Sequence, residues 1–165
     1  MNLYILRHGL AIERGAPGFK KDSDRPLTSK GKRRMKKISE AMEVMELKFD
    51  LILSSPFLRA KQTAKIMAET FGLQKRFAFS EALIPDENPK LLVEQIVKLR
   101  LKNILLVGHE PHLSRFIALL TTGGTDAAIE LKKGGLCKLE MEAPLRDSRA
   151  TLAWLLTPRQ MELMA

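Results

Sequence analysis

Arginine and histidine side chains follow short apolar runs at two places in this chain, and together these residue types can bind and transfer a phosphoryl group. Arg7 and His8 come directly after the apolar residues 3–6, and His109 comes shortly after the apolar run 103–107. Apolar strands exclude charged side chains unless those side chains are paired or used. Because ligands of open α/β sheets bind beyond the carboxyl ends of the strands, the sequence predicts an anion site there.

A third segment adds another arginine and a hydroxyl group to this set. Residues 54–64, Ser-Ser-Pro-Phe-Leu-Arg-Ala-Lys-Gln-Thr-Ala, directly follow the apolar run 50–53. We expect Ser55 to cap a helix that Pro56 opens. Arg59 then lies on the first turn, where free backbone N–H groups and the helix dipole favour an anion. Arginine supplies planar charged donors for phosphoryl oxygens, and a histidine with one unprotonated ring nitrogen can attack phosphorus.

Short apolar runs alternate along the chain with segments in which apolar residues recur at helical spacing. Three runs are typical of buried parallel strands: 1–6, 50–53 and 103–107. Helical spacing predicts four helices: 29–45, 58–71, 92–99 and 113–120. Apolar and charged residues alternate after position 136, which predicts a half-exposed strand over 137–142, a turn at 146–149 and a returning strand over 151–156.

Strands that alternate with helices predict an α/β fold. We expect a three-layer α/β/α sandwich with a mainly parallel central sheet, to which the final two strands add an antiparallel edge. No repeat, low-complexity tract or linker divides the 165 residues, so a single domain over 1–165 is expected. The least regular segment, 9–28, is expected to form a surface loop near the anion site.

Composition and charge narrow the class of protein. An excess of 28 Lys and Arg over 19 Asp and Glu gives a formal charge of +9, which favours acidic or phosphorylated partners. No apolar stretch is long enough to span a membrane, and no secretory signal is expected because Arg7 and His8 interrupt the first apolar run. The aromatic content of 5% and the lack of a recognised module argue against nucleic acid as a partner.

Cysteine and histidine usage predicts a reduced protein without a metal site. The single cysteine, Cys137, cannot form an internal disulfide, and the alternation of its segment predicts a buried thiol. The three histidines are scattered and have no zinc-binding spacing. We therefore expect a cytoplasmic protein with no metal and no cofactor.

Four segments, in order along nearly the whole chain, resemble the histidine phosphatase superfamily, also called phosphoglycerate-mutase-like. They are Leu-Arg-His-Gly at 6–9, Arg-Pro-Leu-Thr-Ser-Lys-Gly at 25–31, the segment 54–64, and Val-Gly-His-Glu-Pro at 107–111. Arg-His-Gly alone is a weak signal, whereas the ordered set is specific. The short length and the motif Ser-Pro-Phe-Leu-Arg-Ala are most similar to the small SixA-type phosphohistidine phosphatases.

The resemblance implies a phosphoglycerate-mutase-like fold and a metal-independent phosphatase. His8 would be the nucleophile that becomes transiently phosphorylated, and water would then hydrolyse that intermediate. Arg7, Arg59 and His109 would hold the phosphoryl oxygens and neutralise charge in the transition state.

Further residues are assigned by the same resemblance. Gly9, Ser55 and Asp86 are expected to contribute to substrate binding. Members that act on phosphate esters use a carboxylate near position 81 to protonate the leaving alkoxide, so Glu81 is the first choice for the general acid and Asp86 the second. Imidazole is a better leaving group than an alkoxide, and a SixA-type enzyme therefore needs little acid catalysis.

The substrate that the resemblance implies is protein phosphohistidine. The short loop over 84–89 suits an open site that can accept a protein surface. Two alternatives stay open: a small phosphate ester such as a sugar phosphate, and a phosphoryl-binding module without turnover. The partner is accordingly a phosphorylated protein or a small phosphorylated metabolite, and the sequence indicates no oligomeric state.

Two other features each have a structural and a functional interpretation. The basic residues of 30–37 are expected to form the solvated face of an amphipathic helix, and the alternative is a docking patch for an acidic partner. His112 lies near the start of the helix that Pro111 opens, where a structural or rim role is favoured.

Overall fold

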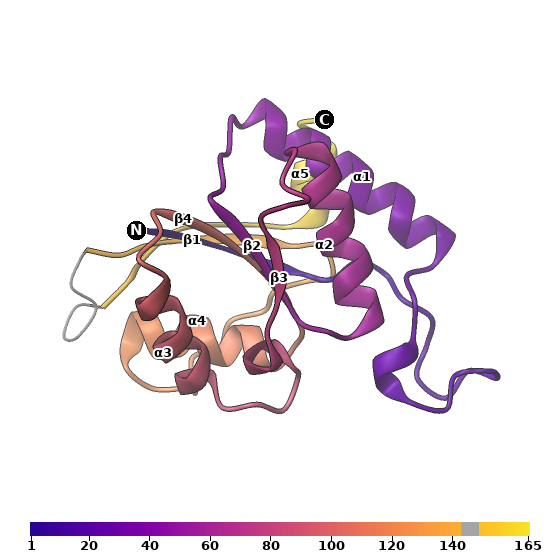
Figure 1. Cartoon of the computed structure of the whole chain (residues 1–165), viewed down its shortest axis with the longest axis horizontal. Helices are drawn as coiled ribbons and strands as arrows, with labels where there is room; N and C mark the ends of the chain where they lie inside the picture. The colour runs from indigo at the N-terminus through magenta and orange to yellow at the C-terminus, as the bar shows by residue number, and fades with distance from the viewer. Residues whose placement is uncertain (143–148) are drawn as a thin grey trace.

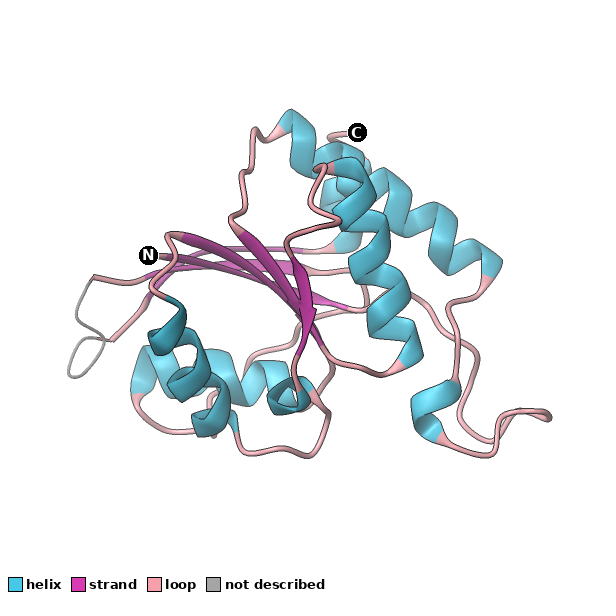
Figure 2. Ribbon diagram, viewed as in Figure 1, coloured by secondary structure: helices cyan, strands magenta, loops and turns pink. Residues whose placement is uncertain are grey.

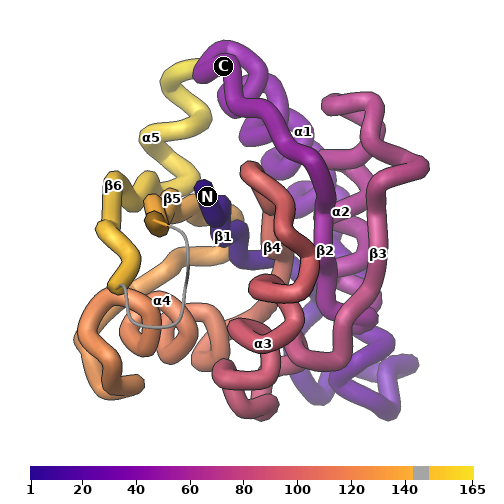
Figure 3. Tube along the Cα trace, turned by 60° about the vertical axis from the view of Figure 1, so that its left-hand side comes forward, coloured from indigo at the N-terminus to yellow at the C-terminus, as the bar shows by residue number. Residues whose placement is uncertain are grey.

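A six-stranded mixed sheet forms the centre of the computed structural model, which describes residues 1–142 and 149–165 (Figure 1). The strands are β1 (Asn2–Arg7), β2 (Leu51–Ser54), β3 (Phe77–Phe79), β4 (Asn103–Gly108), β5 (Leu136–Glu140) and β6 (Thr151–Leu156). Their order is β3-β2-β4-β1-β5-β6, which Figure 3 shows from right to left. The first four in that order are parallel, and β5 runs antiparallel to both β1 and β6.

Helices cover both faces of this sheet (Figures 1 and 2). One face carries α1 (Ser29–Val44), α2 (Leu58–Thr70) and α5 (Pro158–Glu162), and the other carries α3 (Pro89–Leu99) and α4 (His112–Thr122). Two 3-10 turns, η1 (Asp22–Asp24) and η2 (Glu81–Leu83), lie in the connections. These layers confirm the predicted α/β/α sandwich with its antiparallel edge. No helix within the described ranges is long and apolar enough to cross a membrane.

Alternation along β1 explains why both faces of the sheet are covered. Leu3 and Ile5 pack with Phe116 of α4 in one core cluster. Tyr4 and Leu6 belong to the second cluster, on the opposite face beneath α1 and α2. A central strand that is apolar on both faces gains stability only when helices remove both faces from water. The carboxyl end of β1 therefore lies between two helical layers.

The register of β1, β2 and β4 brings three strand ends to one edge of the sheet. Arg7, the last residue of β1, pairs with Gly108, the last residue of β4. Just beyond the strands, the His8 N–H donates to the Gly108 oxygen at 3.1 Å, and the Ser55 N–H donates to the Val107 oxygen at 2.9 Å. The side chains that follow these strands are therefore neighbours, as the predicted anion site requires.

The irregular segment 9–28 joins β1 to α1, and hydrogen bonds hold its second half. The Leu27 N–H donates to the side-chain oxygen of Gln62 on α2 at 2.7 Å. Gly31 lets the first turn of α1 approach the segment, because a Cβ there would lie 2.0 Å from the Leu10 oxygen. The turn η1 inside the segment contacts α2. The segment therefore borders the strand ends, as predicted.

Two short elements, β3 and α5, are not predicted by the sequence patterns. β3 is a three-residue edge strand with no fully buried residue, and its apolar run, Phe-Ala-Phe, is too short to indicate a strand. α5 has five residues, and a capping box between Thr157 and Gln160 starts it. The burial of Met161 in the core stabilises α5, and such a short helix has too few turns to give a periodic pattern. Of the predicted turn over 146–149, residues 146–148 lie outside the described residues.

The prediction that Ser55 caps the following helix is wrong. α2 begins at Leu58 with Phe57 as its N-cap, and no side chain caps it. The Ser55 hydroxyl accepts a hydrogen bond from the Phe57 N–H at 3.3 Å, within the bend that precedes the helix. This bend leaves the hydroxyl beside His109 instead of on the first turn of α2.

Three structural interpretations agree with the observed burial. Cys137 is fully buried, and burial raises the pKa of its thiol to about 12. His112 is also fully buried, which excludes a rim position. On α1, Lys32 and Lys36 are exposed while Met35 is buried, as expected for the solvated face of an amphipathic helix. A docking role for this basic run stays a prediction.

Candidate active site

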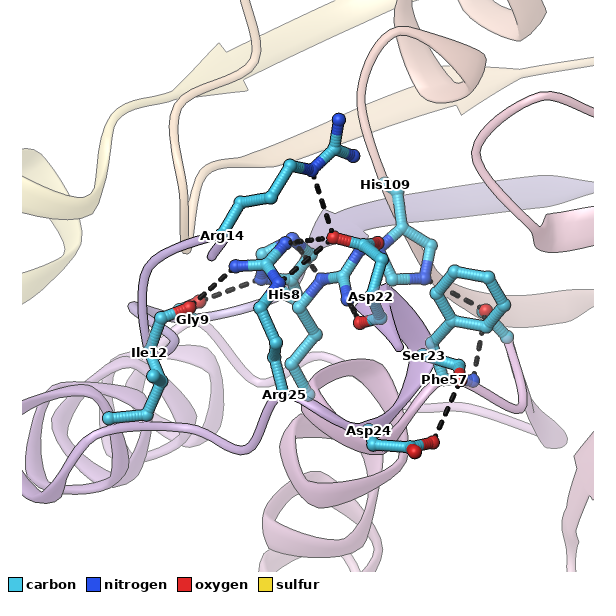
Figure 4. A network of polar contacts seen from close by, with 12 residues as sticks. His8, Gly9, Ile12, Arg14, Asp22, Ser23, Asp24, Arg25, Phe57 and His109 are labelled. Carbon is cyan, nitrogen blue, oxygen red and sulfur yellow. Dashed lines mark hydrogen bonds and ion pairs between the residues drawn. The ribbon is translucent and has the colours of Figure 1, made fainter. Parts of the chain in front are cut away.

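His8 lies directly beyond β1 with its side chain buried, and its two ring nitrogens have different partners (Figure 4). Nδ1 lies 2.7 Å from the carbonyl oxygen of Gly9, and Nε2 lies 3.2 Å from Nε of Arg59. A carbonyl oxygen only accepts, so Nδ1 carries the hydrogen. A guanidinium only donates, so Nε2 presents its lone pair. This is the tautomer in which Nε2 can act as a nucleophile.

The surroundings of His8 also keep its ring neutral. Its pKa is lowered from 6.5 to about 3, with burial as the largest cause. The hydrogen bond to Gly9 opposes this shift, and the positive charges of Arg59 and Arg7 add to it. His8 is therefore unprotonated at Nε2 throughout the physiological pH range.

Arg59 is the second residue of α2, and three groups hold its guanidinium. Besides the bond from Nε to His8, Nη1 donates to the Asp22 backbone oxygen at 2.6 Å and Nη2 donates to Asp22 Oδ2 at 2.8 Å. The Phe57 ring lies 5.3 Å from the guanidinium carbon. Burial lowers the pKa of Arg59 and the bonds to Asp22 oppose that shift, while arginine keeps its charge at any physiological pH.

His109 follows β4 and faces His8, with 5.0 Å between the two ring centroids. Its Nε2 lies 2.8 Å from the Ser55 hydroxyl. Because this hydroxyl can donate to Nε2, the hydrogen of His109 can reside on Nδ1, a buried atom with no partner among the described residues. Burial is the main cause that lowers the pKa of His109 to about 2, followed by His8 and Arg59. The ring is therefore neutral and can donate one hydrogen bond.

Asp22, in the turn η1, belongs to the site although the sequence patterns do not single it out (Figure 4). Its carboxylate accepts hydrogen bonds from Arg59, from Arg25 at 2.7 and 2.9 Å, and from Arg14 at 3.2 Å. Burial alone would raise the pKa of Asp22, but the bonds from Arg25 and Arg59 outweigh it and lower the pKa to about 2. The sequence shows a mixture of acidic and basic residues over 9–28, but no pattern in that mixture distinguishes Asp22 from the other carboxylates as a site residue.

Arg7 points toward a different wall of the site. Its Nη1 donates to the Leu131 oxygen at 2.9 Å, and its Nε is buried without a partner among the described residues. Burial lowers the pKa of Arg7, against the opposing charges of Glu110 and Glu130. Glu110 follows His109 in the chain, and burial raises its pKa. Arg7 therefore lies near the site with an unused N–H group.

Apart from Arg7, the predicted site residues fall into two groups. His8, Ser55, Arg59 and His109, here termed the strand-end cluster, are buried and linked in pairs by hydrogen bonds. Gly9 joins them through its carbonyl group, and its N–H donates to the Thr63 hydroxyl of α2 at 3.1 Å.

Glu81 and Asp86 form the second group, and nothing links either to the strand-end cluster. Glu81 lies in η2, just after Ser80, whose N–H donates to the Ser54 oxygen at 2.9 Å. This places Glu81 on the correct edge of the sheet. Both carboxylates are exposed, and neither makes a hydrogen bond or ion pair within residues 1–142 and 149–165. Their predicted roles in acid catalysis and substrate binding stay predictions.

Comparison with known proteins gives this arrangement a family. The model described as histidine phosphatase superfamily (branch 1) matches residues 3–83, a range that contains His8, Ser55 and Arg59. The chain belongs to the histidine phosphatase superfamily. As a member of this superfamily, the chain is a phosphatase.

Relatives of this histidine phosphatase include two curated proteins. An uncharacterized protein of Picosynechococcus sp. (strain ATCC 27264 / PCC 7002 / PR-6) is 34% identical over 152 residues, which cover 87% of each chain. Phosphohistidine phosphatase SixA of Escherichia coli (strain K12) is 27% identical over 128 residues, which cover 76% of this chain and 77% of SixA.

Solved structures share the whole fold. The protein histidine phosphatase SixA complexed with tungstate has a TM-score of 0.84 at 23% identity and covers 96% of this chain and 98% of its own. A putative alpha-ribazole-5'-P phosphatase from Escherichia coli has a TM-score of 0.78 at 19% identity, with coverage of 96% and 98%. These similarities confirm the predicted phosphoglycerate-mutase-like fold, and the matched proteins differ in the substrates that their names give.

Proposed function

We propose that this protein hydrolyses phosphohistidine on another protein through a phospho-His8 intermediate. The observation that carries the proposal is the tautomer of His8. The Gly9 carbonyl holds Nδ1–H, and the unprotonated Nε2 faces the Arg59 guanidinium at 3.2 Å. A neutral nucleophile and a permanent cation that suits phosphoryl oxygens therefore lie side by side in a buried site.

In the first step, Nε2 of His8 attacks phosphorus in line with the leaving nitrogen. The new N–P bond forms as the substrate's N–P bond breaks. When the other ring nitrogen of the substrate carries a proton, its imidazole leaves as a neutral ring and needs no acid from the enzyme. Phosphorylated His8 keeps its Nδ1 hydrogen, and the Gly9 carbonyl stabilises the resulting positive ring through the existing hydrogen bond.

In the second step, water restores the enzyme. The water oxygen bonds to phosphorus as the N–P bond to His8 breaks. Both hydrogens of the water leave with the product as dihydrogen phosphate, and His8 returns to its neutral form. The low pKa of His8, about 3, favours its departure as a neutral imidazole.

Three nitrogen atoms are available for the phosphoryl oxygens. Nε of Arg59 already donates to Nε2 of His8, and it would donate to a phosphoryl oxygen once phosphorus is bonded there. Nε of Arg7 and Nδ1 of His109 are buried without a partner among the described residues. Oriented donors in a site that excludes water stabilise transferred charge strongly.

The position of the carboxylates supports phosphohistidine over an ester. An alkoxide leaving group needs a proton, whereas the Glu81 carboxylate is exposed and makes no hydrogen bond or ion pair with the described residues of the strand-end cluster. The 27% identity to a phosphohistidine phosphatase supports the same substrate class. A small phosphate ester is the second candidate, and the likeness of the fold to an alpha-ribazole-5'-P phosphatase favours it.

Single-turnover labelling tests the proposal. A protein carrying ³²P-phosphohistidine and a set of simple phosphate esters would be offered to the wild type and to His8→Ala. We expect label to appear on wild-type enzyme and then in free phosphate, with neither product from His8→Ala. Full activity of His8→Ala would contradict the mechanism. Hydrolysis of esters alone would favour the second candidate, and vanadate binding with no hydrolysis of any substrate would indicate a binding module.

A further inference from the structure

A pocket of about 450 Å³ lies beside Arg7, outside the strand-end cluster. It is formed by the end of β1, by α1 and α5, and by the segment that precedes β5. Five basic side chains and one acidic side chain contribute to its walls: Arg7, Arg34, Lys132, Lys133, Arg159 and Glu130. Apart from Arg7, the residues of this basic pocket have no role in the two chemical steps.

The backbone fixes the basic pocket against the nucleophile's strand. The Gly134 N–H donates to the Arg7 oxygen at 3.0 Å, and the Arg7 N–H donates to the Gly135 oxygen at 3.1 Å. Gly134 adopts a φ of +83°, and a Cβ there would lie 2.9 Å from Ile38 of α1 and 3.6 Å from Pro158 of α5. Glycine therefore permits the close approach that places residues 132–133 beside both helices.

Most of the positive charge in the basic pocket is free. The side-chain nitrogens of Lys132, Lys133 and Arg159 make no hydrogen bond or ion pair with any residue that the structure describes. Arg34 forms an ion pair with Glu162 at 2.9 Å, and the charge of Glu130 opposes that of Arg7. Free cations gathered around one pocket create a positive potential that attracts anions.

Positive charges of the basic pocket act on His8. Arg7 belongs both to the wall of the basic pocket and to the residues whose charges lower the pKa of His8. The charge of Lys133 also contributes to that shift, after burial and the two arginines. A substrate whose phosphoryl group lies at His8 would therefore present its neighbouring groups to this pocket.

We propose that the basic pocket binds carboxylate side chains that flank the phosphorylated histidine of the substrate protein. This inference rests on the proposed function. The cations lie on long side chains from separate elements, which suits several carboxylates spread over a protein surface. Lysine acts as a mobile point charge that does not impose one geometry, unlike a paired arginine fork. The pocket would therefore select acidic surroundings and not one sequence.

A pair of phosphohistidine peptides tests this selection. The peptides would be identical except that one carries Glu and the other Gln on both sides of the phosphohistidine. We expect the wild type to have about a tenfold higher kcat/KM for the Glu peptide at low ionic strength, and we expect the preference to shrink as salt screens the charges. The double variant Lys132→Gln/Arg159→Gln should reduce the preference to about twofold through KM, while kcat on the Gln peptide stays unchanged.

The control variant is Lys75→Gln/Lys98→Gln, which removes the same charge from two exposed lysines outside the pocket. It should keep the wild-type preference. Equal rates of wild-type enzyme on both peptides would overturn the inference, as would an equal loss of preference in the control variant. A pocket variant that loses activity only on a small phosphate ester carrying a carboxylate would overturn it in favour of a metabolite. Failure of wild-type enzyme on every phosphohistidine substrate would overturn the proposed function itself, and is recognisable because both peptides fail.

Discussion

The strand-end cluster and the segment 81–86 lie at the same edge of the sheet but are held in different ways. Each side chain of the cluster is at most 5% exposed and is hydrogen-bonded to another member. Glu81 and Asp86 are exposed, and neither has a partner among the described residues. The groups that we propose to attack and bind the phosphoryl group are thus held by hydrogen bonds, whereas the group that would protonate the leaving atom is not. Substitutions in the two regions should therefore differ in size.

The largest effect on turnover, after loss of His8, is expected from Arg59→Ala. This change removes the cation that lies beside Nε2 of His8 and leaves the Asp22 carboxylate without its most buried partner. We expect kcat to fall about 100- to 1000-fold on phosphohistidine, as for the loss of one transition-state donor. Single-turnover rates would measure the fall, and circular dichroism would establish that the variant folds.

Arg59→Lys separates charge from geometry in the same experiment. Lysine keeps the positive charge but cannot bridge His8 and Asp22 with a planar fork. Arg59→Lys should therefore recover only a small part of the rate that Arg59→Ala loses. Recovery to within threefold of wild type would mean that the fixed geometry of the cluster is unimportant.

Ser55→Ala should have a smaller effect within the same cluster. It removes the hydroxyl at 2.8 Å from Nε2 of His109, so the ring loses the partner that orients it. We expect about a tenfold loss of kcat, typical of a supporting hydrogen bond at a site. Ser54→Ala is the matched control, because the equally buried Ser54 hydroxyl donates to the Ser55 backbone oxygen and not to His109. Equal losses in both variants would assign the effect to local packing.

Asp22→Asn should act on stability with a distinct pH dependence. The folded pKa of about 2 lies below the ordinary 3.8, so the carboxylate stabilises the folded state above about pH 4 and loses this effect as the pH falls toward 2. We expect the variant to be less stable by about 1 kcal/mol at neutral pH. Denaturant unfolding at several pH values would measure the difference between the two proteins. Asp24→Asn is the matched control, because the Asp24 carboxylate lies in the same turn but accepts its hydrogen bond from the Ser23 hydroxyl, and this variant should lose less stability at neutral pH.

The smallest effect on phosphohistidine turnover is expected from Glu81→Gln. Because the Glu81 carboxylate makes no hydrogen bond or ion pair among the described residues, kcat should change by less than about twofold on phosphohistidine. A loss of about 100-fold on a phosphate ester in Glu81→Gln, with no such loss in a variant of the exposed Glu94 of α3, Glu94→Gln, would identify Glu81 as an acid for esters. A large loss on phosphohistidine would contradict the division between the two regions.

The layers, and the gathering of four predicted residues in the candidate site, could be predicted because their signals are local. Runs such as 103–107 mark buried strands wherever they occur, and the polar residue that follows each run necessarily lies at the sheet edge. β3 and α5 escape prediction because three and five residues contain too few repeats to form a pattern. The prediction that Ser55 caps α2 is wrong because the chain bends after Ser55, so the helix begins only at Leu58. Residue type alone does not reveal such a bend.

The sequence by itself determined which chemistry the chain carries: His8 and His109 after strands, Arg59 after a third, and the ordered motifs of a histidine phosphatase. Only the tertiary structure decided which partners these groups have. It brought Asp22 to Arg59 across 37 positions and set the tautomer of His8 through Gly9 and Arg59. Hydrogen bonds and burial depend on distances of a few ångströms between distant segments, and local sequence patterns do not encode those distances.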